Sequence, residues 1–573
     1  DPIMPLSEVK PGMQCTARSV VRGTDITSFR ADVVDVVTGD SGAAQPYILI
    51  RVSGPAVEPT GIGPGFSGSP IYCQDGLLGP QRVIGALSEG VGEYGNTLAL
   101  ATPIELILGE PVDVPPETRH APALVRAARP LALPLSVGGL TPPVATLVQR
   151  AAGRAKRVIY AAPARPRADV YPPQTLRPGS ALAASLSSGD FTAGGIGTVA
   201  YVDGDRVWGF GHPLDSAGRR SLFLQDAYVY TVVNNPVGTS DLRTYKYASP
   251  GHDLGTVTSD GISAIAGRVG ALPPRFPLKI VATDLDSGKV RTANMALADE
   301  SALGLPTGIS ALSDIGGIAL AQMTYLTLGG LPLRQSGSMC VRITVRERSK
   351  PMRFCNSYVG GPGTSDEASG GGPIVTDFAT AAQQLDAFNF GPLHVTAVEV
   401  NLKLRRSLRL AYLRRIVKAP AVVQRGKRFR VTVEIQRQNG PKSRRVLTIR
   451  VPRGMPVGER ALSLTGTSPD TSVSSASMDD ALTALLDLGE IPDDGDESGA
   501  RTVAGLALEI AGIHREDGVF AAFAPLGEGP SDPLGDSEKP TGPEAAAQKP
   551  RVVLSDPQLR IAGAAKRRII VVP

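Results

Sequence analysis

The feature that most restricts how this chain can fold is a series of short segments in which apolar and polar residues alternate. These segments span 14–21, 29–37, 47–53, 82–90 and 97–102, and further ones follow at 195–211, 222–233, 278–284 and 339–345. Alternation with a period of two is typical of half-buried strands, and many short strands predict a barrel or a sandwich. Glycine and proline supply 65 + 49 of the 573 residues, which suits a fold with many turns. We therefore expect a mainly β protein.

The pattern divides the chain into five expected parts. Residues 1–111 are a first β-barrel half, 112–190 a proline- and alanine-rich connector, 191–359 a second barrel half, and 360–375 a glycine-rich linker. Residues 376–573 begin with a short helix and continue with strands expected at 393–404, 428–437, 444–452 and 568–573. This spacing predicts an immunoglobulin-like β-sandwich, interrupted by an acidic insertion at about 465–550.

Charge is distributed unevenly along the last part of the chain. Residues 403–450 carry 16 Lys and Arg against the single acid Glu434, whereas 479–548 carry 16 acids against three basic residues. Opposite blocks within one module predict that the acidic segment pairs with the basic face of the sandwich. The alternative is that the basic face 403–450 binds an anionic polymer such as an envelope polysaccharide. The overall net charge of +5 makes nucleic acid an unfavoured partner.

Four cysteines indicate the compartment. Cys340 and Cys355 flank a predicted hairpin and would lie opposite each other on its two strands, where a disulfide is geometrically possible. Cys15 would then pair with Cys73. The alternative is four free thiols, but the chain begins at Asp1, as a mature chain would after signal-peptide removal. We expect a secreted or cell-envelope protein with two disulfides.

No membrane span, metal site or cofactor is expected. The longest apolar runs, such as 318–327, fall short of the ~20 residues that a membrane-spanning helix requires. No pair of cysteines has the spacing of metal ligands, and no glycine-rich phosphate loop is present.

The motif GPGFSGSP at 63–70 is the sharpest candidate for chemistry. A tight turn can present the hydroxyl of Ser67, and the N–H groups of Gly65 and Ser67 can converge on an oxyanion. Gly65 and Gly68 supply the backbone freedom that such a turn requires. The alternative is a glycine–serine turn without chemistry.

The motif FGHPL at 210–214 supplies a candidate general base. His212 follows a predicted strand and precedes a proline, which would hold the imidazole rigidly. The alternative is a structural histidine. The motif gains weight because a candidate nucleophile, Ser67, is present elsewhere in the chain.

At these motifs the chain resembles the SpoIVB-type serine peptidases. PGFSGSPIY, with IGAL and TPIELIL after it, is similar to the family's nucleophile region, whose motif runs G-M-S-G-S-P. Residues 176–214 resemble its G-T-V…G-H-P segment, and 253–270 resemble a further stretch, so the likeness covers roughly 1–110 and 176–347. The resemblance implies a chymotrypsin-like double β-barrel, with Ser67 as nucleophile, His212 as base, and the Gly65 and Ser67 N–H groups as oxyanion donors.

Two departures from the family qualify this expectation. Ser67 precedes His212 in the chain, which implies a permuted order of the two barrels. The position of the family's acidic triad member falls within 50–53, which read IRVS and contain no acid, so that Asp215 or Asp226 is left as the candidate third member. The expected substrate is a peptide or protein, including the chain's own linker at 360–372. The alternative is an inactive envelope scaffold or binding protein built on the same fold.

Overall fold

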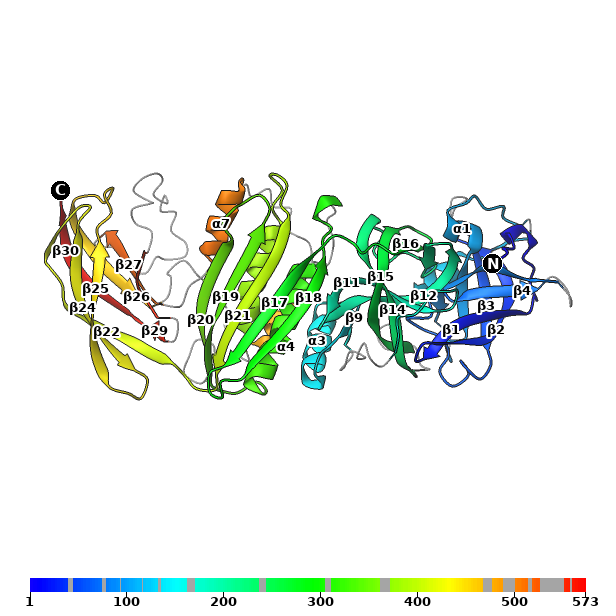
Figure 1. Cartoon of the computed structure of the whole chain (residues 1–573), viewed down its shortest axis with the longest axis horizontal. Coiled ribbons are helices and arrows are strands. Elements are labelled where there is room, and N and C mark those ends of the chain that lie inside the picture. The colour runs from blue at the N-terminus through cyan, green and yellow to red at the C-terminus, as the bar shows by residue number, and fades with distance from the viewer. Residues whose placement is uncertain are drawn as a thin grey trace.

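The computed structural model shows a mainly β protein whose parts follow one another along an elongated molecule (Figure 1). It describes residues 1–573 apart from 40–44, 75–78, 93, 116, 132–134, 162–170, 236–243, 304–310, 361–370, 467–476, 488–499, 514–517, 526–550 and 557–558. A barrel that contains the N-terminus lies at one end, and a sandwich that contains the C-terminus lies at the other.

The first barrel is a closed ring of six strands. In ring order they are β1 (Cys15–Arg22), β4 (Pro70–Gln74), β5 (Gln81–Val91), β6 (Leu98–Pro103), β3 (Tyr47–Ser53) and β2 (Asp25–Thr38), and β2 pairs with β1 to close the ring. Inward-facing apolar residues such as Ile48, Ile50 and Val52 on β3 are buried, while Arg51 on the other face is exposed. The apolar and polar residues that alternate in the sequence of β3 therefore face the barrel core and the surface in turn.

A second closed ring of six strands follows. In ring order they are β11 (Ala181–Gly189), β12 (Thr192–Asp203), β13 (Arg206–Gly209), β16 (Ile265–Val269), β15 (Tyr245–Asp260) and β14 (Gly218–Val233), which pairs with β11. Short strands β9 (Ser136–Gly138) and β10 (Tyr160–Ala161) extend this sheet beyond β12. The residues expected to be a connector, 112–190, thus contribute β9, β10 and β11 to the second barrel.

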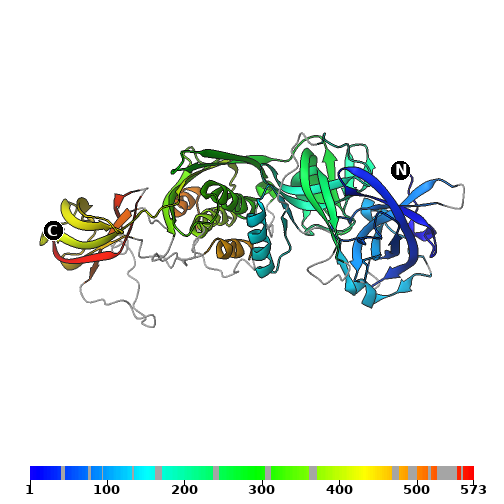
Figure 2. The same cartoon turned by 90° about the horizontal axis from the view of Figure 1, so that it is seen from below.

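The sheet continues from β11 into a third, open part. Its strands, in spatial order, are β18 (Val290–Ala298), β17 (Arg275–Asp284), β21 (Val395–Arg405), β19 (Gln335–Val345) and β20 (Met352–Gly360). Five helices cover one face of this sheet (Figure 2): α3 (Pro142–Arg154), α4 (Gly316–Leu328), α5 (Gly372–Asp386), α6 (Met478–Leu486) and α7 (Val503–Ala511). Most of α4 is buried, because it lies between the sheet and the other helices.

Three expected boundaries are corrected by this third part. The strand predicted at 393–404 belongs to β21, which pairs with β17 and β19 instead of joining the sandwich. Strands β17, β18, β19 and β20, all within the expected second barrel half 191–359, belong to this open sheet and not to the second ring. The acidic stretch supplies α6 and α7, which pack against the other helices and β20. Alternation reveals that a segment is a strand, but the partner strand depends on contacts distant in sequence.

The C-terminal part is a two-sheet sandwich. One sheet has the order β25 (Lys442–Arg450), β24 (Arg428–Arg437), β22 (Leu410–Lys418) and β29 (Arg560–Ala562). The other has the order β23 (Val422–Gln424), β30 (Ala564–Val572), β26 (Gly458–Thr465), β27 (Gly518–Pro525) and β28 (Arg551–Ser555). Val431, Val433 and Ile435 on β24 face the core between the sheets, as the sequence predicts.

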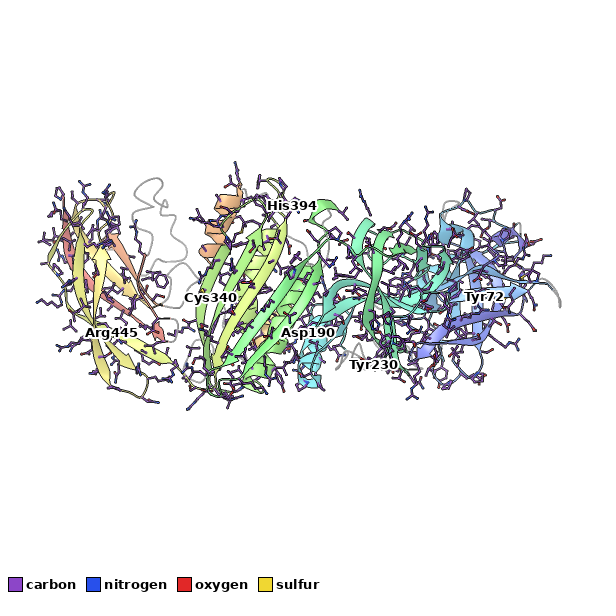
Figure 3. The ribbon with its side chains drawn as sticks, in the orientation of Figure 1. Tyr72, Asp190, Tyr230, Cys340, His394 and Arg445 are labelled. Atoms are coloured by element: carbon purple, nitrogen blue, oxygen red, sulfur yellow. A yellow bond between two sulfur atoms is a disulfide. The ribbon has the colours of Figure 1, made fainter. Side chains whose placement is uncertain are left out.

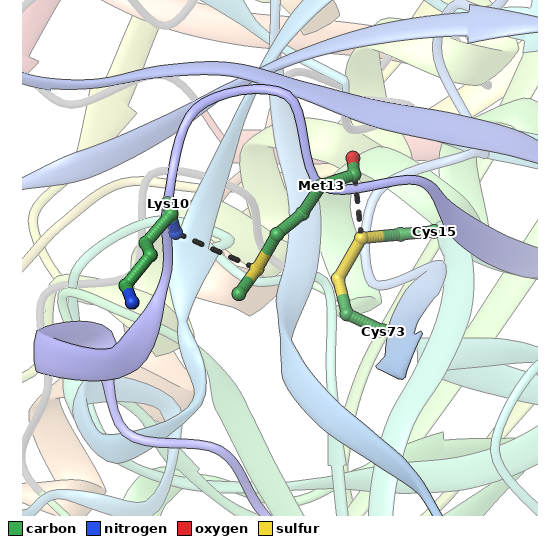
Figure 4. The surroundings of a disulfide bond; sticks show 4 residues. All are labelled: Lys10, Met13, Cys15 and Cys73. Atoms are coloured by element: carbon green, nitrogen blue, oxygen red, sulfur yellow. Dashed lines mark hydrogen bonds between the residues drawn. A yellow bond between two sulfur atoms is a disulfide. The ribbon is translucent and has the colours of Figure 1, made fainter. Parts of the chain in front are cut away.

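Both expected disulfides are present. Cys15 on β1 is bonded to Cys73 on β4, beside Met13 (Figure 4). Cys340, labelled in Figure 3, lies directly opposite Cys355 across β19 and β20 and is bonded to it. Among the residues that the structure describes, no helix is long and apolar enough to cross a membrane.

We expect the Cys15–Cys73 disulfide to contribute more stability than the other one. It closes a sequence separation of 58 residues against 15 for Cys340–Cys355, and loop-entropy arguments assign about 4 and about 3 kcal/mol to loops of these lengths. Calorimetric unfolding of the double variants Cys15→Ala with Cys73→Ala and Cys340→Ala with Cys355→Ala measures the difference. A larger loss in the second variant would show that local packing outweighs loop length.

Candidate functional site

The Ser67 loop is built by glycines that no other residue can replace. Gly65 and Gly68 have φ angles of +98° and +86°, in the left-handed region, as the sequence analysis expects. A Cβ atom on Gly68 would lie 1.9 Å from the carbonyl oxygen of Thr198 on β12. Since the Ser67 carbonyl also accepts a 2.7 Å hydrogen bond from the Thr198 N–H, the loop is pressed against the second barrel.

The His212 turn lies against the first barrel. Phe210 and Gly211 both have a φ of +69°, a conformation that costs free energy for a phenylalanine and is held here by complete burial of its ring. The Gly211 carbonyl accepts a 2.6 Å hydrogen bond from the Thr102 hydroxyl on β6. The side chain of His212 follows directly and the residue is only 3% exposed.

The two motifs meet at the junction between the barrels. The N–H of Gly68, next to Ser67, donates a 2.7 Å hydrogen bond to the Leu87 carbonyl on β5. A Cβ atom on Gly211, next to His212, would lie 3.2 Å from that same oxygen. On the other side of the loop, the Phe210 N–H donates to the Thr198 carbonyl at 3.3 Å. Residues far apart in the sequence are thus brought to one place, as the two motifs predict.

Ser67 and His212 each present one buried polar atom without a partner. Neither the Ser67 hydroxyl nor His212 Nε2 makes a hydrogen bond within the described part of the chain, so the two are not bonded to each other. His212 Nδ1 lies 2.6 Å from the Pro213 carbonyl oxygen. Because a carbonyl only accepts, Nδ1 carries the hydrogen and Nε2 is left as an acceptor. The site therefore holds an unsatisfied donor and an unsatisfied acceptor.

Burial keeps His212 neutral. Loss of hydration lowers the pKa of His212 to about 4, and the Pro213 carbonyl and the charge of Asp260 oppose this shift only in part. A histidine with so low a pKa is uncharged at pH 7, which is the protonation state of a general base.

The two carboxylates considered as a third member have other partners. Asp215 accepts a 2.9 Å hydrogen bond from Arg220. Asp226 is buried and accepts from His252 Nδ1 at 3.0 Å and from the Tyr171 hydroxyl at 2.9 Å. Neither is hydrogen-bonded to His212, so the expectation that one of them orients it is corrected.

Asp260 is the carboxylate that shapes the turn after His212. Its oxygens accept hydrogen bonds from the backbone N–H groups of Leu214, Asp215 and Ala217 at 2.6, 2.7 and 3.2 Å. These hydrogen bonds hold the backbone of the turn that follows His212. The Asp260 carboxylate is not hydrogen-bonded to the imidazole, and its charge affects the pKa of His212 only through space. The sequence analysis missed this role, because Asp260 lies 48 positions beyond His212 in the chain.

Of the two N–H groups expected to be oxyanion donors, one is already hydrogen-bonded within the chain. The Gly65 N–H donates a 2.8 Å hydrogen bond to the Leu131 carbonyl. The Ser67 N–H makes no hydrogen bond in the portion of the chain described here. The Gly65 donor is therefore used within the chain in this structure, and the expected role of the two N–H groups as oxyanion donors stays a prediction.

Lys246 on β15 is a second residue at this site that the sequence analysis missed. It is completely buried, and its backbone N–H donates to the Pro64 carbonyl at 2.8 Å. Its side-chain carbons lie only 2.8–3.0 Å from where a Cβ atom on Gly65 would be. The ammonium nitrogen lies 2.6 Å from the Ser19 hydroxyl and 3.2 Å from that of Thr198. The only sequence signal is that period-two alternation places this lysine on the opposite face from its two tyrosine neighbours.

Within the described part of the chain, the surroundings of Lys246 contain acceptors but no counter-ion. Besides Ser19 and Thr198, the nitrogen lies 4.4 Å from the centre of the Phe66 ring, and Ser69 is hydrogen-bonded to Ser19 at 3.0 Å. Among the described residues, no carboxylate is hydrogen-bonded to the ammonium group. Burial accordingly lowers the pKa of Lys246 well below its ordinary value.

Among the described residues, the remaining histidines and possible metal ligands form no further site. His252 is paired with Asp226, and His394, labelled in Figure 3, lies 2.6 Å from Glu347. His120 is exposed on β7 (Arg119–His120), and His514 lies outside the described residues. Within the residues described, no group of three or more His, Cys, Asp or Glu could hold a metal ion.

The basic face of the sandwich is not covered by the acidic residues that the structure describes. The side chains of Arg428, Arg444, Arg445 and Arg450 on β24 and β25 are exposed. Asp479 on α6 forms ion pairs with Arg150 and Arg154 of α3, a helix that Figure 1 shows well away from the sandwich. Most of the remaining acidic stretch, 488–499, 514–517 and 526–550, lies outside the described residues.

Comparison of the chain with family models, with curated proteins and with solved structures finds no match.

We expect Lys246 to make the second barrel more stable at alkaline pH. Between its lowered folded pKa and about 10.4, the lysine is neutral when folded and protonated when unfolded. The unfolded state then binds more protons, so the free energy of unfolding rises with pH, by at most about 1.4 kcal/mol per pH unit. Urea unfolding at pH 7 and 9.5, followed by the fluorescence of the single tryptophan Trp208 on β13, measures this rise.

The variant Lys246→Met should abolish this pH dependence, whereas Lys279→Met, which changes an exposed lysine on β17, should leave it intact. An equal slope in the native chain and in Lys246→Met would show that the buried lysine stays charged.

Proposed function

We propose that the chain is a serine hydrolase of the SpoIVB peptidase type, with Ser67 as nucleophile and His212 as general base. One observation carries the proposal: the buried Ser67 hydroxyl and the buried His212 Nε2, both without a hydrogen-bond partner among the described residues, stand on two turns that contact the same Leu87 carbonyl where the two barrels meet. Two closed rings of six strands support a chymotrypsin-like double barrel in which the serine barrel precedes the histidine barrel. Catalytic triads tolerate any chain order, since only the geometry matters.

In this mechanism Ser67 Oγ attacks the carbonyl carbon of a peptide bond, and its proton passes to His212 Nε2. The N–H groups of Gly65 and Ser67 stabilise the resulting oxyanion, and His212 returns the proton to the leaving amine. Water then hydrolyses the acyl-enzyme by the same route. The Pro213 carbonyl holds Nδ1 in place of a carboxylate.

A neutral carbonyl cannot stabilise the imidazolium as a carboxylate does. In triad enzymes, loss of the acidic member's function lowers the rate by about four orders of magnitude. We therefore propose a slow peptidase that acts on peptides or proteins in an exported, cell-envelope setting, a setting with which the two disulfides are compatible. The C-terminal sandwich is proposed to be immunoglobulin-like.

We expect a fluorophosphonate probe to label Ser67 slowly, over hours at pH 7. Ser67→Ala and His212→Asn should each reduce labelling at least a hundredfold, because they remove the nucleophile and its base. His252→Asn, which changes another largely buried histidine of the same barrel, should retain labelling. Because the pKa of His212 is about 4, the labelling rate should fall by half only near pH 4. A half-point near 6.5, or equal labelling of Ser67→Ala, would contradict the proposed site.

A second candidate function, a non-catalytic binding protein, is favoured by one cavity in the sandwich. The cavity has a volume of about 300 Å³ and lies between the edge strands β25 and β28. Its rim carries three arginines, Arg428, Arg450 and Arg551, above a buried floor that includes Ile449 and Phe523. Arg428 and Arg450 are direct cross-strand neighbours, an arrangement of like charges that an anion would stabilise.

We expect this cavity to contribute to the binding of an anionic polymer. For a dextran sulfate fragment at fixed salt, Arg428→Gln with Arg450→Gln should weaken binding at least tenfold. The matched pair Arg444→Gln with Arg445→Gln removes the same charge from β25 outside the cavity and should cost about twofold or less. Equal losses in the two double variants would indicate diffuse attraction to the basic face and no specific site.

A further inference from the structure

A buried arginine stands beside the turn that follows His212. The side chain of Arg220 on β14 is only 2% exposed, and arginine is almost never enclosed to this extent unless it is paired. Its guanidinium donates two hydrogen bonds to the carboxylate of Glu300, from Nε at 2.9 Å and from Nη2 at 3.0 Å. Such two-point pairs are strong and directional, so Glu300 fixes the plane of the guanidinium.

The third nitrogen of the guanidinium faces the turn. Nη1 of Arg220 donates a 2.9 Å hydrogen bond to Asp215 and lies 3.9 Å from an oxygen of Asp260. Asp260 in turn accepts hydrogen bonds from backbone N–H groups of the same turn, including the N–H of Asp215. Arg220 is therefore joined to the two carboxylates that belong to the turn or hold it.

Glu300 connects this arrangement to the third part of the protein. It lies two residues beyond β18, and one of its oxygens also accepts a 2.7 Å hydrogen bond from the Ser221 N–H. The guanidinium of Arg220 is thus held by a residue outside the second ring of strands. Its distance from Asp260 is set on one side by this residue and on the other by the turn.

The charges of the cluster do not cancel. Among the described residues, the one guanidinium pairs with three carboxylates, which come from the turn, from the end of β15 and from the segment after β18: Asp215, Asp260 and Glu300. Asp215 is half exposed and its charge is screened by water, whereas the side chain of Asp260 is fully buried. Of the three, Asp260 is the group whose charge raises the pKa of His212. The positive charge of Arg220 lies against Asp260 and opposes that effect.

We propose that Arg220 is a positioning residue of the Ser67–His212 site and acts through Asp260, because it sets how strongly the negative charge of Asp260 reaches the imidazole. This inference rests on the proposed function. His212 becomes an imidazolium when it takes the Ser67 proton, and a nearby negative charge lowers the free energy of that state. Asp260 thus supplies part of the stabilisation that a hydrogen-bonded acidic triad member would give, and Arg220 limits it.

Removal of the arginine charge should raise the pKa of His212. In Arg220→Gln the charge of Asp260 is no longer opposed, and the pKa should rise from about 4 by about one unit. Arg220→Lys restores a positive charge and should return the pKa to within about 0.3 units of the native value. Arg219→Gln removes the same charge from the exposed neighbour on β14 and should leave the pKa unchanged.

The route through Asp260 has its own test. In Asp260→Asn the charge that acts on His212 is absent, so the further change Arg220→Gln should no longer raise the pKa of His212. A rise of the same size with and without Asp260 would overturn the inference. The double variant Arg220→Gln with Glu300→Gln keeps amide groups in place of the ion pair and should show the same rise as Arg220→Gln. It serves as the test chain if the single variant does not fold.

The pKa of His212 can be measured without any activity. The chain contains five histidines, so ¹³C labelling of their imidazoles gives few NMR signals, and the signal absent from His212→Asn is that of His212. The pH at which fluorophosphonate labelling of Ser67 falls by half reports the same group through the reaction, and it should move with the NMR value. A merely structural arginine would change the labelling rate or the stability but not this half-point.

The two measurements separate this inference from the proposed function. Labelled Ser67 with the same His212 pKa in the native chain, in Arg220→Gln and in the double variant would overturn the inference alone. A raised His212 pKa in chains whose Ser67 is never labelled would contradict the proposed function and leave the electrostatic role of Arg220 standing. An unlabelled Ser67 with an unchanged pKa would overturn both.

Discussion

The rest of the site depends on a backbone contact that only glycine permits. Gly68 approaches the Thr198 carbonyl so closely that a Cβ atom would lie 1.9 Å from it, and the Ser67 carbonyl is hydrogen-bonded to the Thr198 N–H. This contact joins the serine loop of the first barrel to β12 of the second. It also sets the positions of the Phe210 and Gly211 turn, because Phe210 is bonded to the same Thr198. The Ser67 loop, strand β12 and the turn before His212 therefore fix one another's positions.

Burial at this junction controls charge. Desolvation lowers the pKa of both His212 and Lys246, so the interior between the barrels favours neutral side chains. Asp260 acts on His212 only through space, since its oxygens bind backbone N–H groups. The Pro213 carbonyl then becomes the group that orients the imidazole. In the same dry environment the Ser67 hydroxyl and His212 Nε2 have no hydrogen-bond partner among the described residues, an arrangement that is costly because unsatisfied buried polar atoms destabilise a fold.

Much of the site was predictable because it depends on local rules. Positive φ angles at Gly65 and Gly68 follow from a tight turn, and Cys340 and Cys355 follow from hairpin register. The hydrogen-bond partners of Asp215 and Asp226, the two candidates for the acidic member of a triad, were not predictable. Tertiary packing places Arg220 beside Asp215 and His252 beside Asp226. Lys246 was missed for the same reason: a lysine in a tyrosine-rich strand gives no sign that Ser19 and Thr198 will enclose it.

The sequence by itself determined that the protein is mainly β, which residues form most of its strands, which cysteines pair, and which serine and histidine stand on constrained turns. These properties arise from alternation, turn chemistry and register, which act over a few residues. Only the tertiary structure decided that β21 pairs with β17 and β19, that α6 and α7 pack over their sheet, and that Leu131 takes the Gly65 donor. Those outcomes depend on which distant surfaces bury the most apolar area and satisfy the most backbone hydrogen bonds together, and no local pattern encodes that sum.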